Sequence, residues 1–186
     1  TAGNDIDYGP VVTKAAQERI FGLIDSGVKQ GAELVVDGRG FKLQGYENGF
    51  YVGPTLFDRV TPDMEIYKQE IFGPVLSTVR SETYEEALKL TMDNEYGNGT
   101  AIFTRDGDTA RDFASRVNVG MVGVNVPIPV PVPMFSFTGS RASKLGDLGP
   151  YGKQVVQFYT QTKTITERWF DENEVGGPVN TTINLK

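Results

Sequence analysis

The sequence predicts an α/β fold in which helices flank a mainly parallel sheet, and two observations carry this prediction. Between residues 75 and 126, short β-branched runs alternate with amphipathic segments of about ten residues, the order of elements that produces parallel sheets. Hydrophobic residues make up 39% of the chain, with 11 Phe and 8 Tyr, which is enough for a real core in 186 residues.

The absence of two residue types excludes several kinds of catalytic and metal site from this chain. The chain has no Cys and no His, which removes disulfides, thiol nucleophiles, imidazole bases and the usual zinc ligands together. Its possible bases and nucleophiles are therefore Ser, Thr, Lys, Tyr or carboxylates, and no metal site is predicted. A net charge of -6 with a pI near 4.8 disfavours nucleic acid or anionic membrane as a partner. No apolar run approaches the roughly 18 residues of a transmembrane helix.

The first elements follow from helix and strand signals. Thr13 is predicted to cap a helix that ends at Gly31. Residues 32–37 are predicted as a strand and residues 38–49 as an irregular excursion. The apolar face of the helix is predicted to comprise Ala16, Ile20, Leu23, Ile24 and Val28.

Residues 50–60 are predicted as an extended segment interrupted by a Gly-Pro pair. Pro54 lacks the N–H that a sheet ladder needs, so the segment is expected at a sheet edge or in a crossing loop.

The stretch KQEIFGPVL at 68–76 is the first candidate site. In an extended segment, residues two apart project from the same face, so Glu70 and Phe72 are expected side by side. A carboxylate accepts hydroxyl hydrogen bonds and a ring offers a flat wall, a pair that suits a sugar bearing a planar heterocycle. A charge at a strand entry beside a core Phe gives the same pattern, so both interpretations stay open here. Pro74 predicts that the strand begins at Val75.

The next elements complete the predicted core. Thr83, with Glu86 three residues on, forms a capping box for a helix over about residues 83–93. Strands are predicted at 100–104 and 121–126, and Asp108 is predicted to cap the helix between them.

A proline at every second position of 127–133 favours polyproline II structure. Such a run is usually a solvated linker or an SH3-type ligand, but the intervening Ile and Val favour a rigid loop packed against the body. Residues 153–159 are expected to be helical and 160–169 to form a strand that pairs with another domain or subunit. Residues 171–186 are expected to be a polar tail.

Seven motifs in order resemble the C-terminal part of the aldehyde dehydrogenase superfamily. They are GPVV at 9–12, GAELVVDG at 31–38, PTLFDRVTPDM at 54–64, EIFGPVL at 70–76, GTAIFTRD at 99–106, GMVGVNV at 120–126 and YTQTKTIT at 159–166. Within it, NVPIPVPVPMFSFTGS at 125–140 and YGKQVVQFYTQTKT at 151–164 resemble the branch that acylates coenzyme A, the methylmalonate-semialdehyde dehydrogenases. The Ser at 140 departs from the large aromatic expected there.

The resemblance implies an enzyme larger than this chain. Such an enzyme binds NAD in a Rossmann-like domain, attacks methylmalonate or malonate semialdehyde with a cysteine, passes hydride to NAD and transfers the acyl group to coenzyme A. The products would be propionyl-CoA or acetyl-CoA. The chain begins without Met and lacks Cys, so it is interpreted as an inactive piece whose nucleophile lies upstream. The compartment would be the cytoplasm in a bacterium and the mitochondrial matrix in a eukaryote.

The resemblance also implies roles for individual residues. Glu70 would accept hydrogen bonds from the nicotinamide ribose and Phe72 would flank the ring. Asn125 would support the active-site loop, and Phe135 and Phe137 would lie near the substrate tunnel.

At the level of domains, residues 1–150 are expected to form part of a catalytic domain. Residues 151–170 are expected to form a helical turn and an oligomerisation strand within a homo-oligomer, a tetramer in the parent enzyme, and 171–186 the tail. Two alternatives stay open: a non-acylating NAD-dependent dehydrogenase of another aldehyde, and a non-enzymatic interaction module that uses the proline-rich loop.

Overall fold

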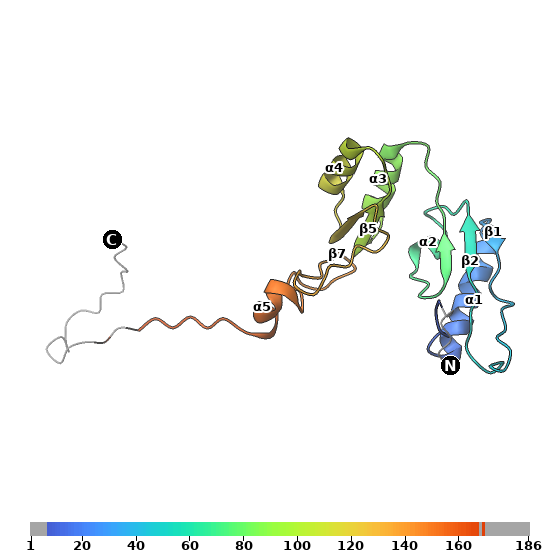
Figure 1. The fold of residues 1–186 in the computed structure, drawn as a ribbon, viewed down its shortest axis with the longest axis horizontal. Helices are drawn as coiled ribbons and strands as arrows, with labels where there is room; N and C mark the ends of the chain where they lie inside the picture. Colours follow the sequence, from blue (N-terminus) through green and yellow to red (C-terminus); the bar gives the residue numbers. More distant parts are fainter. Residues whose placement is uncertain (1–6, 168, 170–186) are drawn as a thin grey trace. The chain divides into compact units, whose positions relative to one another are not determined.

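The computed structural model describes residues 7–167 and 169, and its chain divides into two compact units (Figure 1). The first unit comprises Thr1–Val130 and Thr138–Asp147, and the second comprises Pro131–Phe137 and Leu148–Lys186. Helices and short strands alternate along the first unit, which confirms the predicted α/β class. Within the described residues, no helix combines the length and the apolarity needed to cross a membrane.

A three-stranded sheet and two helices form the first hydrophobic core. The elements are α1 (Lys14–Lys29), β1 (Glu33–Val36), β2 (Thr55–Asp58), α2 (Glu65–Lys68) and β3 (Val75–Ser77). The strand order is β1-β2-β3, with β1 antiparallel and β3 parallel to β2. Figure 1 shows α1 alongside this sheet, and the fully buried Phe57 of β2 joins the apolar side chains of α1 in the core.

Helix α1 begins and ends where the sequence predicted. The Thr13 hydroxyl accepts a hydrogen bond from the backbone N–H of Ala16 at 3.1 Å, and Gly31 has a φ of 96°, a conformation that favours glycine. Ile20, Leu23 and Ile24 are buried as predicted. Val28, which belongs to the same predicted apolar face, lies at the last turn of the helix and is 45% exposed.

Residues 50–60 were predicted at a sheet edge or in a crossing loop, and the sheet edge is wrong, because β2 is the central strand of its sheet. Pro54 precedes the strand by one residue, so its missing N–H removes no bond from the ladder. The ladder begins with Thr55, whose N–H donates to the Pro74 carbonyl at 2.9 Å.

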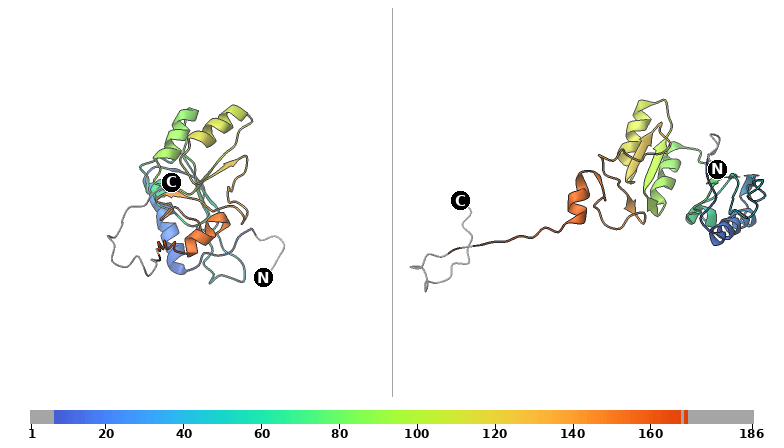
Figure 2. Two further views of the ribbon diagram at one scale, coloured as in Figure 1. Left: turned by 90° about the vertical axis from the view of Figure 1, so that its left-hand side faces the viewer. Right: turned by 60° about the horizontal axis from the view of Figure 1, so that its bottom comes forward.

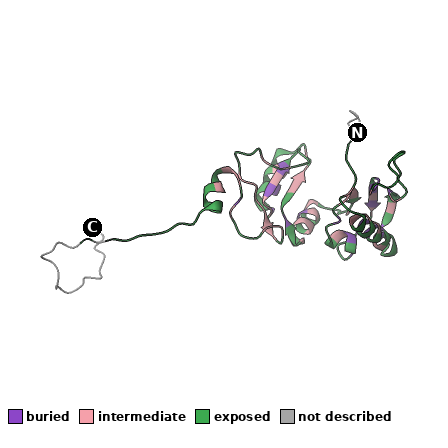
Figure 3. Ribbon diagram, turned by 90° about the horizontal axis from the view of Figure 1, so that it is seen from below, coloured by how far each residue is buried: buried purple, intermediate pink, exposed green. Residues whose placement is uncertain are grey.

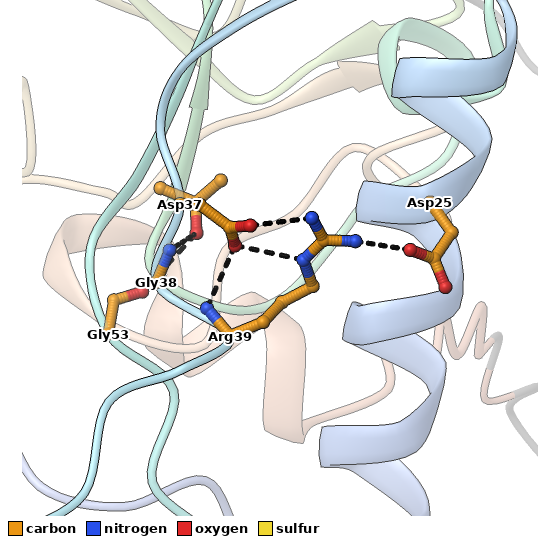
Figure 4. A network of polar contacts seen from close by, with 6 residues as sticks. Asp25, Asp37, Gly38, Arg39 and Gly53 are labelled. Atoms are coloured by element: carbon orange, nitrogen blue, oxygen red, sulfur yellow. Dashed lines mark hydrogen bonds and ion pairs between the residues drawn. The ribbon is translucent and has the colours of Figure 1, made fainter.

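The excursion after β1 is closed by two glycines whose main chains touch. The N–H of Gly53 donates to the Gly38 carbonyl at 2.9 Å, and a Cβ on Gly38 would lie 1.9 Å from the Gly53 oxygen. Next to this crossing, the Arg39 guanidinium bridges the carboxylates of Asp37 and Asp25 (Figure 4). Its hydrogen bonds to Asp37 lower the pKa of that carboxyl to about 2.

A second, smaller core lies in the same unit. Its elements are α3 (Tyr84–Asp93), β4 (Tyr96–Gly97), β5 (Gly99–Ile102), α4 (Gly107–Arg116), β6 (Met121–Val124) and β7 (Ser140–Arg141). Figure 2 shows α3 and α4, in green and yellow, beside the β5–β6 pair, and Leu88, Phe113 and Val117 are the buried residues between them.

Two helix starts in this core test the predicted caps. Thr83 caps α3 as predicted, with its hydroxyl accepting from the Glu86 N–H at 3.2 Å. The cap of α4 was wrongly placed at Asp108. Asp106 takes this role, because its carboxylate accepts from the N–H groups of Asp108 at 3.2 Å and of Thr109 at 3.1 Å.

The strands pair in three separate groups. Among the described residues, β5 and β6 form a parallel pair, β4 and β7 an antiparallel pair, and β3 pairs with β2 only. The parallel pairs agree with the predicted strand direction, whereas β4, β7 and the short helix α2 were not predicted.

The proline-rich loop divides between the two units. Pro129 packs in the first unit, where a Cβ on Gly99 would lie 3.0 Å from its ring. The intervening Ile128, Val130 and Val132 are each more than half exposed, so the prediction that they pack against the body does not hold among the described residues.

The second unit is built around a 3-10 turn, Gly152–Gln154, and helix α5 (Val155–Tyr159), where a helical segment was predicted. Residues 160–167 follow without a strand partner among the described residues, and Figure 3 colours this stretch as exposed. The predicted tail at 171–186 lies outside the described residues.

Candidate functional site

The turn that carries Glu70 is fastened to helix α1. Arg19 of α1 donates hydrogen bonds to the backbone carbonyls of Glu70, at 3.2 Å, and of Ile71, at 2.5 Å. The side chain of Ile71 is buried in the first core, and the carboxylate of Glu70 is exposed. The turn therefore has one buried anchor and one polar anchor, and both leave the Glu70 carboxylate available to a ligand.

Phe72 and Gly73 shape the rest of the turn. A Cβ on Gly73 would lie 2.6 Å from Cδ1 of Ile20, so this position needs glycine for the turn to approach α1. Phe72 has a φ of 53° and is 76% exposed. The predicted extended conformation thus ends at Phe72, whose ring is free of the core, and β3 begins at Val75 as predicted.

Glu70 lines a cavity of about 410 Å³ within the first unit. The other lining residues are Tyr67, Lys68, Gln69, Tyr96, Asn98, Ala142 and Ser143. Most of these side chains are polar, and only one is a carboxylate. The cavity therefore combines the Glu70 carboxylate and the Lys68 ammonium with neutral donors and acceptors, a pattern that suits a ligand rich in hydroxyl groups.

The carboxylates near this cavity raise the pKa of Tyr96. Its pKa is raised chiefly by its hydrogen bond to the Glu95 carboxylate. The charge of Glu95, burial and the charge of Glu70 act in the same direction, because each disfavours the phenolate. The phenol of Tyr96 therefore stays protonated, with its O–H donated to the Glu95 carboxylate.

A loop that is distant in sequence supplies the remaining wall. Strand β7 pairs with β4 through Tyr96 opposite Arg141 and Gly97 opposite Ser140. The Gly97 N–H donates to the Ser143 hydroxyl at 3.0 Å, and the Ser140 hydroxyl donates to the Gly97 carbonyl at 3.2 Å. Ser140, which replaces the expected aromatic, thus bonds the main chain of β4.

Asn125 closes the end of the β5–β6 pair. Its side-chain oxygen accepts from the Thr104 N–H at 2.9 Å and its side-chain nitrogen donates to the Thr104 carbonyl at 3.0 Å. Its own N–H donates to the Ile102 carbonyl at 2.8 Å, and its φ is 56°. Both ends of the amide are therefore used by the main chain.

Phe135 and Phe137 belong to the second unit. The ring of Phe137 lies 6.1 Å from that of Tyr151, centroid to centroid, and Phe135 is 62% exposed. A Cβ on Gly152 would lie 2.6 Å from the Ser136 nitrogen, so the loop passes close to the start of the 3-10 turn. Their predicted place beside a substrate tunnel stays a prediction.

Several residues of the site were not predicted from the sequence. Arg19 lies on the polar side of an amphipathic helix, where a solvated charge is the ordinary expectation. Tyr96, Asn98 and Ser143 lie in short strands or turns without periodicity, and Gly97 bonds to Ser143 across 46 residues of chain. The Gly-rich punctuation around Asn98 was the one local signal for a close approach of the main chain.

Comparison with known proteins decides the family. The model of the aldehyde dehydrogenase family matches residues 2–165. The chain belongs to the aldehyde dehydrogenase family. The C-terminal resemblance read from the seven motifs is confirmed, and the match includes the proline-rich loop and the Glu70 turn.

Curated relatives of this aldehyde dehydrogenase chain include two semialdehyde dehydrogenases. The malonate-semialdehyde dehydrogenase of Pseudomonas aeruginosa is 62% identical over 164 residues, which are 88% of this chain and 33% of that protein. The mitochondrial acylating methylmalonate-semialdehyde/malonate-semialdehyde dehydrogenase of Bos taurus is 60% identical over 167 residues, 90% of this chain and 31% of that protein. The chain thus spans about a third of the length of these relatives.

A solved structure gives the same picture of the fold. It is described as a putative methylmalonate-semialdehyde dehydrogenase from Sinorhizobium meliloti complexed with NAD. It superposes with a TM-score of 0.83 at 67% sequence identity, covering 89% of this chain and 34% of that chain.

Proposed function

We propose that this aldehyde dehydrogenase chain is part of an NAD-dependent, coenzyme A-acylating semialdehyde dehydrogenase. The enzyme would oxidise methylmalonate or malonate semialdehyde and transfer the acyl group to coenzyme A. The observation that carries the proposal is the exposed Glu70 carboxylate in a polar cavity, in a chain about 60% identical to acylating semialdehyde dehydrogenases.

The cavity around Glu70 fits the nicotinamide ribose of NAD. A ribose has two neighbouring hydroxyl groups that donate hydrogen bonds, and the two carboxylate oxygens of Glu70 are acceptors. Asn98 and Ser143 line the same cavity and add neutral polar groups. Bound NAD would supply the acceptor for a hydride from the substrate. Phe72, which follows Glu70 by two residues and is 76% exposed, would then offer its ring to the nicotinamide.

The division of labour within such an enzyme follows from what this chain contains. Its residues would bind and orient the cofactor, and the nucleophilic cysteine would come from another part of the protein, because this chain has none. Phe135 and Phe137 would border the path of the aldehyde. Asn125 would hold the chain after β6 through its bonds to Thr104.

Assembly and compartment complete the proposal. Residues 160–167 have no strand partner within the described chain and alternate in β-branched residues, so we propose that they add to a sheet of another subunit in a homo-oligomer. Light scattering should detect dimers or larger species, and a monomer would contradict this assembly.

The compartment would be the cytoplasm in a bacterium and the mitochondrial matrix in a eukaryote, the latter as in the Bos taurus relative.

Glu70→Gln tests the role of the carboxylate in a dehydrogenase of the relatives' full length that carries this chain. The amide keeps the shape but loses the charge and one acceptor, so hydride transfer should slow by about 10-fold or more. Stopped-flow absorbance of NADH measures this step. Glu85→Gln is the matched control, because Glu85 is exposed and pairs with Arg116 away from the cavity. Equal kinetics for Glu70→Gln and the parent would sink the role.

A second measurement addresses the division of labour. The 186-residue chain alone should not reduce NAD in the presence of methylmalonate semialdehyde and coenzyme A, because no thiol is available to form the thioester. Turnover above the uncatalysed rate would overturn the proposal that the nucleophile comes from another part of the protein.

A further inference from the structure

The loop that completes the Glu70 cavity is fastened by one arginine. The Arg141 Nη1 atom lies 2.6 Å from the Met92 carbonyl and 2.6 Å from the Asn94 carbonyl. The Thr91 carbonyl is 3.4 Å from both terminal nitrogens. These carbonyls belong to the end of α3 and the residue that follows it, so the guanidinium caps the helix from 47 residues further along the chain.

Helix α3 needs this cap. The last carbonyls of any helix lack partners within the helix and carry its negative end. The last turn of α3 contains no basic residue, so the helix has no cation of its own there. Arg141 supplies both the positive charge and a fork of donors in fixed geometry, which a single ammonium group does not.

The cap fixes the loop as much as the helix. Strand β7 pairs with β4 over only two residues, which is too short to hold a loop by itself. Arg141 also has a φ of 55°, a conformation that a non-glycine residue keeps only when its surroundings enforce it. The bonds of its guanidinium, its pairing with Tyr96 of β4 and the Lys144 N–H bond to its carbonyl together hold this conformation.

The residues that follow Arg141 are those that line the cavity. Ala142 donates its N–H to the Glu95 carbonyl at 3.0 Å, and the Ser143 hydroxyl accepts from the Gly97 N–H at 3.0 Å. Both residues share the cavity of about 410 Å³ with Glu70. A shift of Arg141 would therefore move this wall while leaving the Glu70 turn, which Arg19 holds, in place.

We propose that Arg141 is a positioning residue for the cofactor cavity, which sets the affinity for the nicotinamide ribose by fixing Ala142 and Ser143 against β4. The proposal rests on the proposed function of Glu70. It assigns Arg141 no contact with the ligand.

Three variants test the proposal: Arg141→Met, Arg141→Lys and the control Arg111→Met. Arg111 is 76% exposed in its side chain and pairs with Asp108 on the surface of α4, so its loss removes the same charge from an unrelated place. The first readout is amide hydrogen exchange of Ala142 and Gly97 in the 186-residue chain, which needs no cofactor. Arg141→Met should speed exchange at both amides about 10-fold or more, while the amides of α1 keep their protection.

The second readout is NAD binding in the full-length dehydrogenase that carries this chain. Arg141→Met should raise the Kd for NAD about 10-fold while kcat at saturating NAD stays within about twofold, because a misplaced wall weakens binding more than chemistry. Arg141→Lys should fall between, since it keeps the charge but not the fork. Added guanidinium ion at millimolar concentration should partly restore NAD binding to Arg141→Met but not alter Arg111→Met.

The outcomes separate this proposal from the function on which it rests. Unchanged exchange at Ala142 and Gly97 in Arg141→Met would overturn the positioning role, whatever NAD does. Faster exchange with an unchanged Kd for NAD would overturn the link to the cavity. If Glu70→Gln leaves NAD binding and hydride transfer unchanged, the proposed function of Glu70 fails, and the exchange data still decide whether Arg141 holds the loop.

Discussion

The two cores of the first unit differ in how they hold the walls of one cavity. The first core contains ten buried hydrophobic residues, among them Phe57, Ile20 and Ile24 at 0% exposure. The second core contains three, Leu88, Phe113 and Val117. Glu70 is fixed through the first core by the buried Ile71, whereas Ala142 and Ser143 are fixed in the second by main-chain hydrogen bonds and Arg141.

This difference shows that two kinds of interaction can fix the position of a cavity wall. Apolar burial stabilises the fold by roughly 25 cal/mol per Å² of buried area. Because it has no direction, it tolerates small shifts of the side chains. A hydrogen bond adds about 1 kcal/mol net but fixes direction and distance. The wall built by the small core should therefore be more sensitive to single polar changes, and the wall built by the large core to cavities.

The largest expected effect comes from a cavity in the first core. Phe57→Ala removes a fully buried ring and should lower the free energy of unfolding by about 4 kcal/mol. Phe113→Ala in the second core, where Phe113 is 6% exposed among fewer neighbours, should cost less, about 3 kcal/mol. Urea denaturation, monitored by far-UV circular dichroism, measures both changes in the free energy of unfolding.

Hydrogen exchange sharpens this comparison of the cores. If each core unfolds as its own unit, Phe57→Ala should lower the protection of α1 amides and leave those of α4 near their original values. Equal loss of protection in α1 and α4 would show that the two cores unfold together, and the comparison would then fail.

A glycine crossing gives the next effect in size. Gly38→Ala places a methyl group 1.9 Å from the Gly53 carbonyl (Figure 4), so the main chains must separate, which should cost roughly 2 kcal/mol of unfolding free energy. Gly40→Ala is the matched control, because a Cβ there meets no atom within 4 Å. Thermal unfolding of the two variants should place Gly38→Ala clearly lower. A similar midpoint for both would show that the crossing relaxes without cost.

The smallest effect is a pH dependence at the edge of the first core. Asp58 accepts hydrogen bonds from Arg80 and from the Arg59 N–H, which lower its pKa from 3.8 to about 2. A carboxyl whose pKa is lower in the folded state stabilises the fold above pH 3.8 and loses this contribution as the pH falls through about 2. Denaturation at several pH values measures the slope.

Two variants assign that slope to the ion pair. Asp58→Asn and Arg80→Met should each flatten the fall in stability between pH 4 and pH 2, and the double variant should add little to either. The difference should shrink in high salt, because the Arg80 side chain is 66% exposed. A slope unchanged in both single variants would assign the acid sensitivity to other carboxyls.

The sequence predicted best where a periodic pattern carried the structure. The face of α1, the cap at Thr13 and the start of β3 at Val75 each follow from local rules that packing did not override. One error lies where a local rule had two solutions. Asp106 and Asp108 both precede the apolar residues of α4, and only the backbone geometry selects Asp106.

The site was less predictable than the fold for a physical reason. Glu70 stood out because a carboxylate beside a Gly-Pro bend is unusual, but its cavity depends on contacts between distant segments. Arg141 bonds the end of α3 across 47 residues, and neither segment carries a periodicity that points to the other. Such pairings depend on tertiary structure, which a single sequence does not encode as a local pattern.

Besides Arg59, three of the residues discussed above, Phe72, Asn125 and Arg141, adopt positive φ without being glycine. Each such conformation costs roughly 1–3 kcal/mol, and glycine would avoid most of that cost. Selection for thermal stability alone would therefore drive these positions towards glycine, at the expense of the ring, the amide and the guanidinium that they present. If variants of the enzyme are selected for both thermal stability and turnover, these positions should keep their larger side chains. Glycine at these positions in the selected variants would therefore indicate that selection for stability was the stronger of the two.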